Sequence, residues 1–271
     1  MSSMNYSDLQ TATGEELVRL IHEVPTDMLS PILDNPALDE KYLALLLHRK
    51  GLPSEFLTEL LKRRQLLKNY LVKKLLAFHP HTPRTDALRL LRDLYLMDLV
   101  QFSISPEVRP DLKRKAEDQV IAKMAQLPLG QKITLARRSP ARIAGSLLAD
   151  GQPMVVKATL SNPNLTEAQV LRVLAKEKLA PVVAQSIAQH EKWSHVYNVR
   201  IALLRQPSTT VATVLTFLPE LAVSDLRELA APGVLPEDLR YYLQAEIHRR
   251  SQKLKLPSDG SSEDPAANRG E

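Results

Sequence analysis

Histidines are the first side chains in this sequence that could do chemistry, because closely spaced histidines can bind zinc. His190 and His195 stand five residues apart, and Glu191 lies beside the first. Residues at i and i+5 of a helix lie about 140° apart around its axis. The two rings therefore cannot face one metal ion. The chain has no cysteine, which also excludes thiolate zinc sites and disulfides. We expect no metal site.

Another histidine belongs to a recurring pattern, a polar residue directly before proline. The members of this pattern are Asn35, His79, Asn162 and Gln206. A metal site at His79-Pro80-His81 would need carboxylates or cysteines nearby, and none cluster there. A polar side chain that caps the backbone at a helix end explains all four positions better.

Aspartates Asp98 and Asp225 are each followed by leucine and occupy equivalent places in the two halves of the chain. Each could act as an acid in a groove, but a residue in the first turn of a helix or at its N-cap is the simpler interpretation. The sequence contains no Gly-x-Gly-x-x-Gly, no P-loop and no Gly-x-Ser-x-Gly pattern. We therefore expect no enzyme activity and no cofactor.

Basic clusters are the remaining candidates, in a chain whose formal net charge is +5. If they shared one face, they could neutralise phosphates and bind nucleic acid. The alternative is an ordinary solvated surface. Aromatic residues could stack on bases, although Tyr70 and Tyr197 also fit the interior. The candidate nucleic-acid-binding residues are Arg63, Lys74, Arg114, Arg137, Arg138 and Arg142, and the candidate stacking residues are Tyr70, Trp193, Tyr197, Tyr241 and Tyr242.

A repeat indicates the elements that position these side chains. Leu-x-Asn-Pro at 33–36 returns at 160–163, a shift of 127 residues (163 − 36). At the same shift Leu76 matches Leu203, and further apolar positions match without a gap. A spacing of 44 residues occurs within each half, from Pro36 to Pro80 and from Pro163 to Pro207. Such periods are typical of stacked helical hairpins.

The sequence thus predicts an all-α protein, an α-solenoid of helical hairpins in two tandem duplicated halves. We place the halves at residues 1–126 and 127–253 and expect the polar segment 254–271 to be disordered. One long helix over 106–126 is expected to join them. Low aromatic content (4%) and abundant aliphatic side chains favour helix packing.

The pattern at 33–40 and 160–167, with half-units of about 22 residues, resembles HEAT-like repeats and the related leucine-rich repeat variant. The segment 129–138 also resembles uncharacterised bacterial proteins built from such repeats. The resemblance, which covers roughly residues 10 to 250, implies a curved, armadillo-like array with a concave face. It implies a binding scaffold and no shared active site.

Two functions follow as hypotheses. The first is a non-enzymatic scaffold that binds a protein or peptide partner along its concave face. The second is a solenoid that binds nucleic acid in a basic groove. One version of the second resembles bacterial alkylpurine DNA glycosylases of HEAT-like repeats, but Trp193 has no aspartate beside it. The N-terminus lacks a signal-peptide pattern and no segment is apolar enough to span a membrane, so we expect a cytoplasmic protein with no membrane contact.

Overall fold

The computed structural model describes residues 6–253 of the 271-residue chain. Within that range the chain forms helices that are joined by short turns, and it contains no strand. The all-α fold class predicted from the sequence is therefore confirmed. The predicted disordered tail, 254–271, lies outside the described residues.

The described residues divide into two compact units. Unit 1 comprises the chain up to Leu147 together with Ser161–Leu165. Unit 2 comprises Leu148–Leu160 and the chain from Thr166 onward. This division follows contacts in space, whereas the predicted halves at 1–126 and 127–253 follow the sequence repeat and stay a prediction.

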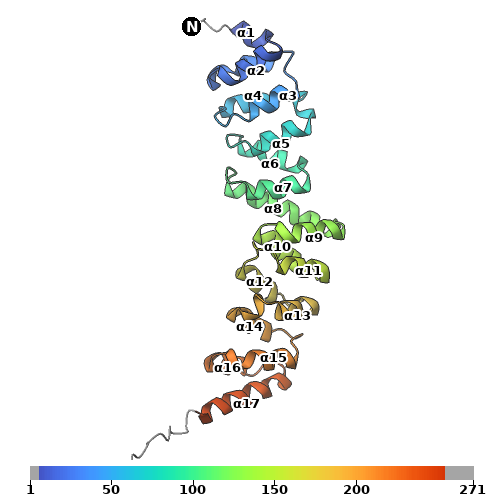
Figure 1. The fold of residues 1–271 in the computed structure, drawn as a ribbon, viewed down its shortest axis with the longest axis vertical. Helices are drawn as coiled ribbons and strands as arrows, with labels where there is room; N and C mark the ends of the chain where they lie inside the picture. Colours follow the sequence, from blue (N-terminus) through green and yellow to red (C-terminus); the bar gives the residue numbers. More distant parts are fainter. Residues whose placement is uncertain (1–5, 254–271) are drawn as a thin grey trace, which may run out of the picture. The chain divides into compact units, whose positions relative to one another are not determined.

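Unit 1 contains ten helices in its described part, the last of which ends one residue into unit 2 (Figure 1). Short 3-10 helices at Thr26–Met28, Ser30–Asp34, Leu66–Lys68, Leu91–Asp93 and Met124–Gln126 link them. The α-helices are α1 (Tyr6–Thr11), α2 (Gly14–Glu23), α3 (Glu40–Leu47), α4 (Ser54–Lys62), α5 (Tyr70–Phe78), α6 (Arg84–Leu90), α7 (Leu96–Ile104), α8 (Pro110–Lys123), α9 (Leu129–Arg138) and α10 (Ala141–Leu148).

Unit 2 is built from the same kind of short helix. Its 3-10 helices are Trp193–His195 and Leu218–Glu220. The α-helices of its described part are α11 (Pro153–Leu160), α12 (Glu167–Leu174), α13 (Pro181–Gln189), α14 (Tyr197–Leu204), α15 (Val211–Phe217), α16 (Val223–Leu229) and α17 (Glu237–Lys253).

Helices within a unit contact their second neighbours as well as their next neighbours. In unit 1, α3 packs against α5 and α6 packs against α8, while α5–α6 and α7–α8 are adjacent pairs (Figure 1). In unit 2, α12 packs against α14 and α15 against α17. In each unit, therefore, helices that are two apart in the chain lie against one another.

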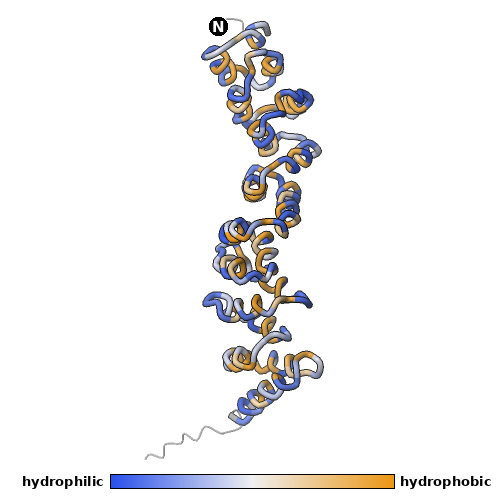
Figure 2. Tube along the Cα trace, turned by 90° about the vertical axis from the view of Figure 1, so that its right-hand side faces the viewer, coloured by the Kyte–Doolittle hydropathy of each residue, from blue (hydrophilic) through white to orange (hydrophobic). Residues whose placement is uncertain are grey.

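Short amphipathic helices supply the core of each unit. Polar and apolar residues alternate turn by turn along the trace (Figure 2). Leu57, Leu60 and Leu76 are fully buried in unit 1, and Val170 and Val199 are fully buried in unit 2. A helix this short gains most of its stability from such packing, because its own hydrogen bonds are marginal in water.

Helix bounds recur between the units at the 127-residue shift. Glu40–Leu47 becomes Glu167–Leu174, and Ser54–Lys62 becomes Pro181–Gln189. The helix Arg84–Leu90 likewise corresponds to Val211–Phe217. The same local signals therefore start and stop helices at matched positions of the two units.

The side chains that precede proline are buried and hydrogen-bonded to backbone, in agreement with the capping interpretation. The Asn35 amide donates to the carbonyls of Leu9 and Ala12 at 2.8 and 2.9 Å. Its counterpart Asn162 donates to the carbonyls of Ala136 and Ser139 at 2.8 and 3.0 Å. Both acceptor pairs are also related by the shift of 127 residues.

His79 and Gln206 satisfy backbone carbonyls in the same manner. His79 Nε2 lies 3.0 Å from the carbonyl oxygen of Arg49, and the Gln206 amide donates to the carbonyl of Leu174. An unpaired carbonyl at a buried helix end costs free energy. These side chains therefore hold consecutive helices together.

Two expectations about the elements need correction. The 44-residue spacing does not correspond to one hairpin, since Pro36 precedes α3 whereas Pro80 lies between α5 and α6. The two prolines mark junctions that are three helices apart. The long helix expected over 106–126 begins only at Pro110, because proline suits the first helical position, and it closes with the 3-10 helix Met124–Gln126.

Candidate functional site

Three of the six candidate basic residues are neutralised by carboxylates. Arg63 Nη1 lies 2.6 Å from an oxygen of Asp34, and Lys74 Nζ lies 2.8 Å from an oxygen of Asp98. Each cation thus has a carboxylate close enough to compete with a phosphate. The ion pairs therefore make Arg63 and Lys74 poorer candidates for binding phosphate.

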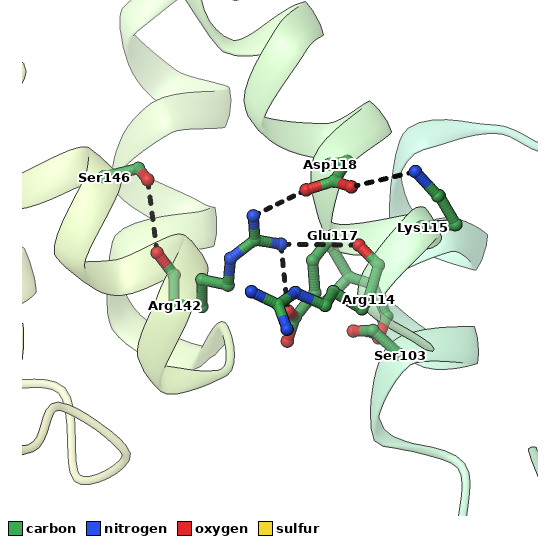
Figure 3. Close-up of polar contacts among 8 residues, drawn as sticks. Ser103, Arg114, Lys115, Glu117, Asp118, Arg142 and Ser146 are labelled. Carbon is green, nitrogen blue, oxygen red and sulfur yellow. Dashed lines mark hydrogen bonds and ion pairs between the residues drawn. The ribbon is translucent and has the colours of Figure 1, made fainter. Parts of the chain in front are cut away.

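Arg142 is paired with two carboxylates of one helix. Its guanidinium on α10 reaches Asp118 at 2.5 Å and Glu117 at 3.4 Å, both on α8 (Figure 3). Hydrogen bonding to Asp118 raises the pKa of Arg142, against the effect of burial. The arginine also donates to the carbonyl of Arg114 at 3.3 Å. Arg142 therefore joins α10 to α8 inside unit 1.

Arg114, Arg137 and Arg138 have exposed side chains on α8 and α9. They remain accessible to a partner. The structure thus separates the six candidates into three that hold helices together and three that face solvent.

Trp193 does not serve as a stacking platform. Its side chain is 2% exposed, and its indole nitrogen donates to the carbonyl of Leu160 at 3.1 Å. In unit 1 the matching carbonyl, that of Leu33, accepts from Arg63 instead. The same backbone acceptor is satisfied by an indole in one unit and by a guanidinium in the other. Of the other candidates, Tyr241 is 69% exposed and Tyr242 is half-buried.

His190 and His195 lie on separate elements. His190 follows the last residue of α13, and His195 belongs to the 3-10 helix Trp193–His195. Among residues 6–253, no group of three or more His, Asp or Glu side chains could hold a metal ion. No helix in this range is long and apolar enough to cross a membrane.

A tyrosine–aspartate pair links α5 to α7, which the sequence interpretation of Asp98 missed. The Tyr70 hydroxyl donates to Asp98 and accepts the backbone N–H of Tyr95 at 3.0 Å. Tyr197 makes the same two bonds, to Asp225 and to the N–H of Ala222. The signal was present in the sequence, because both pairs are separated by 28 residues (98 − 70 and 225 − 197).

Electrostatics keep Tyr70 a hydrogen-bond donor. Burial and the hydrogen bond to Asp98 raise the pKa of Tyr70 to about 12. Burial alone would raise the pKa of Asp98, but hydrogen bonds from Lys74 and Tyr70 lower it. A protonated phenol that donates to an ionised carboxylate joins α5 to α7. Asp98 is therefore a positioning residue and not a free acid in a groove.

An apolar groove opens beside this pair in unit 1. It has a volume of about 360 Å³ and lies between the start of α7 and the start of α9, lined by Tyr95, Leu96, Met97, Gly130, Gln131 and Thr134. Tyr95 is 66% exposed and Met97 is 54% exposed. We call this the α7–α9 groove.

Tyr95 is fixed at the rim of the α7–α9 groove by the tyrosine–aspartate pair. Its ring stacks on Tyr70 with centroids 4.1 Å apart and planes at 26°, and its N–H is bound by the Tyr70 hydroxyl. A preorganised aromatic ring loses little entropy when it binds a partner. The groove therefore presents one rigid aromatic and one flexible methionine to an apolar side chain.

No family model, curated protein or solved structure matches the chain. The HEAT-like resemblance of the Leu-x-Asn-Pro pattern therefore stays an expectation. What the structure establishes is an all-helical fold whose described helices lie in contact with their second neighbours.

Proposed function

We propose that this protein is a non-enzymatic helical-repeat scaffold, an α-solenoid of two duplicated halves, that binds a protein or peptide partner. The observation that carries the proposal is the α7–α9 groove, which exposes Tyr95 and Met97 around a hollow of about 360 Å³. Contiguous exposed apolar surface is a usual mark of a protein-binding site. Tyrosine and methionine are also enriched where proteins bind one another.

Contacts that match at the 127-residue shift support the duplication. The asparagine bonds, the tyrosine–aspartate pairs and several helix bounds all recur at a shift of 127 residues. Contacts between second-neighbour helices support the stacked arrangement. A solenoid offers extended rows of helices to a partner, which suits a scaffold better than an enclosed active site.

Nucleic acid binding through the six basic candidates has less support. Arg63, Lys74 and Arg142 are each paired with a carboxylate. Trp193 is buried, so it cannot stack on a base. Short DNA and RNA titrated at two salt concentrations test this alternative directly, because phosphate contacts weaken steeply with added salt.

The proposed function is tested with a displayed library of short random peptides selected on the immobilised protein. We expect selected peptides to carry an apolar anchor and to bind with micromolar dissociation constants in calorimetry. Met97→Glu should weaken them at least about tenfold, or 1.4 kcal/mol, because it places a charge in the apolar groove.

Met154→Glu is the matched control. Met154 is 61% exposed and is the second residue of α11, just as Met97 is the second residue of α7. It should leave binding unchanged. Failure to select any peptide, or equal weakening by both substitutions, would contradict a docking role for the α7–α9 groove.

A further inference from the structure

A second groove in unit 1 is lined by more cations than carboxylates. It has a volume of about 540 Å³ and lies among the end of α4, α5 and α6, lined by Leu61, Arg64, Leu67, Lys68, Lys73, Asp86, Arg89, Leu90 and Asp93. Its four cations outnumber its two carboxylates. We call it the cationic groove.

The cations in this groove fall into two kinds. Lys73 is bound to Asp93 at 2.7 Å and is largely covered. Arg64 and Lys68 are exposed, and the described residues offer neither of them a carboxylate partner. Arg89 reaches Asp86 only at 3.5 Å with its side chain 81% exposed, and so exposed a pair contributes little. Arg64, Lys68 and Arg89 are thus open to an anionic partner.

Comparison with unit 2 shows which of these charges the helical repeat itself uses. At the 127-residue shift, Lys73 and Asp93 become Arg200 and Glu220, which also form an ion pair. The structural pair therefore recurs with different side chains. A pair that recurs in both units serves to hold the helices.

The open cations do not recur in unit 2. Arg64 is replaced by Glu191, Lys68 by His195 and Arg89 by Thr216. The fold of unit 2 forms matching helices without them. Helix packing therefore does not require these cations in unit 1.

The composition of the cationic groove matches an acidic peptide better than a bare phosphate. Leucines 61, 67 and 90 give it an apolar floor between the cations, which suits side chains that alternate carboxylate and aliphatic groups. Asp93, which lines this groove, stands two residues before Tyr95 on the rim of the α7–α9 groove. Two residues span at most about 7 Å, so one extended segment can follow both grooves.

We infer that the cationic groove binds an acidic, leucine-bearing segment of the partner, with Arg64, Lys68 and Arg89 contacting its carboxylates. The inference rests on the proposed function and specifies the chemistry of the partner. Charge complementarity of this kind steers association and selects among partners.

The test uses a fluorescent peptide of alternating Glu and Leu, a Gln-for-Glu version and a single-stranded oligothymidylate, titrated by anisotropy at low and high salt. We expect the acidic peptide to bind, its affinity to fall with salt, and the Gln peptide to bind at least tenfold more weakly. Arg64→Gln with Lys68→Gln should weaken the acidic peptide about tenfold. Both residues are exposed, so the circular dichroism spectrum should not change.

Lys176→Gln with Lys178→Gln is the control, because it removes the same charge from two exposed positions of unit 2. Equal weakening by both double variants would overturn the inference, as would equal binding of the Gln peptide. Tighter binding of the oligonucleotide, lost in the Arg64/Lys68 variant, would also overturn it in favour of nucleic acid. Selected peptides that respond to Met97→Glu but not to Arg64→Gln/Lys68→Gln would leave the proposed function standing and remove this inference alone.

Discussion

Tyr70 and Tyr197 occupy matched positions in the two units and make the same two hydrogen bonds, one to an aspartate and one from a backbone N–H. Their surroundings differ. Unit 1 adds Lys74 on the aspartate and Tyr95 stacked on the ring, whereas the residues at those positions in unit 2 are Ile201 and Ala222.

Under the proposed function, this difference separates the contacts that hold the helices from the side chains that would bind a partner. The bonds that recur join α5 to α7 and α14 to α16, so they belong to the repeat. Of the additions in unit 1, Tyr95 lines the α7–α9 groove, and Lys74 directly follows Lys73 of the cationic groove. Under the proposed function, unit 1 would thus bind the partner with side chains that unit 2 lacks, while both units share the contacts that hold their helices.

The largest effect is expected when one of two matched core leucines is replaced, which tests the contacts that both units share. Leu76 and Leu203 are 0% and 1% exposed. Leu76→Ala and Leu203→Ala should each lower the free energy of unfolding by about 2–5 kcal/mol, through lost apolar contact and the cavity left behind. Urea unfolding measures the lost free energy of unfolding. Hydrogen exchange followed by mass spectrometry shows which unit has lost stability.

Leu71→Ala is the control for these leucines. Leu71 belongs to α5, the helix that carries Leu76, but it is 40% exposed, so its replacement should cost less than about 1 kcal/mol. A loss near zero for either Leu76 or Leu203 would break the equivalence of the two units.

Sequence spacing was sufficient for features that depend on one helix at a time. Aspartate is a preferred N-cap residue, and the carboxylate of Asp39 accepts the N–H groups of Lys41 and Tyr42 at the N-terminus of α3. Residues before proline were expected to cap helix ends, and Asn35 and Asn162 do so. Such signals lie within a few residues of their effect.

Contacts between side chains of different helices could not be predicted from the sequence. Nothing in the spacing showed that Arg63 would meet Asp34, or that Trp193 would turn inward to a backbone carbonyl. Such contacts depend on where helices far apart in sequence come to lie. The α7–α9 groove is missed for the same reason, since residues 95–97 and 130–134 meet only after folding.

Removing the hydroxyl of Tyr70 or of Tyr197 tests whether the two tyrosine–aspartate pairs stabilise their units equally. The expected loss of stability is smaller than for the leucines. Tyr70→Phe should cost about 1 kcal/mol, because the covered Asp98 loses a donor and the Tyr95 N–H loses its acceptor. Tyr197→Phe should cost less, about 0.5 kcal/mol, since Tyr197 is 37% exposed and water can replace the hydroxyl. Thermal and urea unfolding of both variants measure the difference. Equal costs would show that the additions in unit 1 do not strengthen the pair.

The smallest expected effect is a dependence of stability on pH, which compares the matched positions of His79 and Gln206. Both side chains bond to a backbone carbonyl of an earlier helix end, but only His79 titrates. Burial lowers the pKa of His79 from its ordinary value of 6.5, with His81 acting in the same direction and the Arg49 carbonyl and Glu107 opposing. The neutral ring is therefore the form that the folded protein favours.

Because the unfolded chain takes up the proton first as pH falls below 6.5, this contribution is fully present above that pH. It is lost as pH falls from 6.5 through the lowered pKa of the folded state. His79→Gln, which copies the residue of unit 2, should keep the carbonyl bond and remove this part of the pH dependence. Urea midpoints of the two proteins at pH 7.5 and 5.5 measure it: wild type should lose more stability on acidification than the variant. Identical losses would mean that the carbonyl bond, and not the burial of a neutral ring, is all that His79 contributes, which would make the two positions equivalent in energy as well as in geometry.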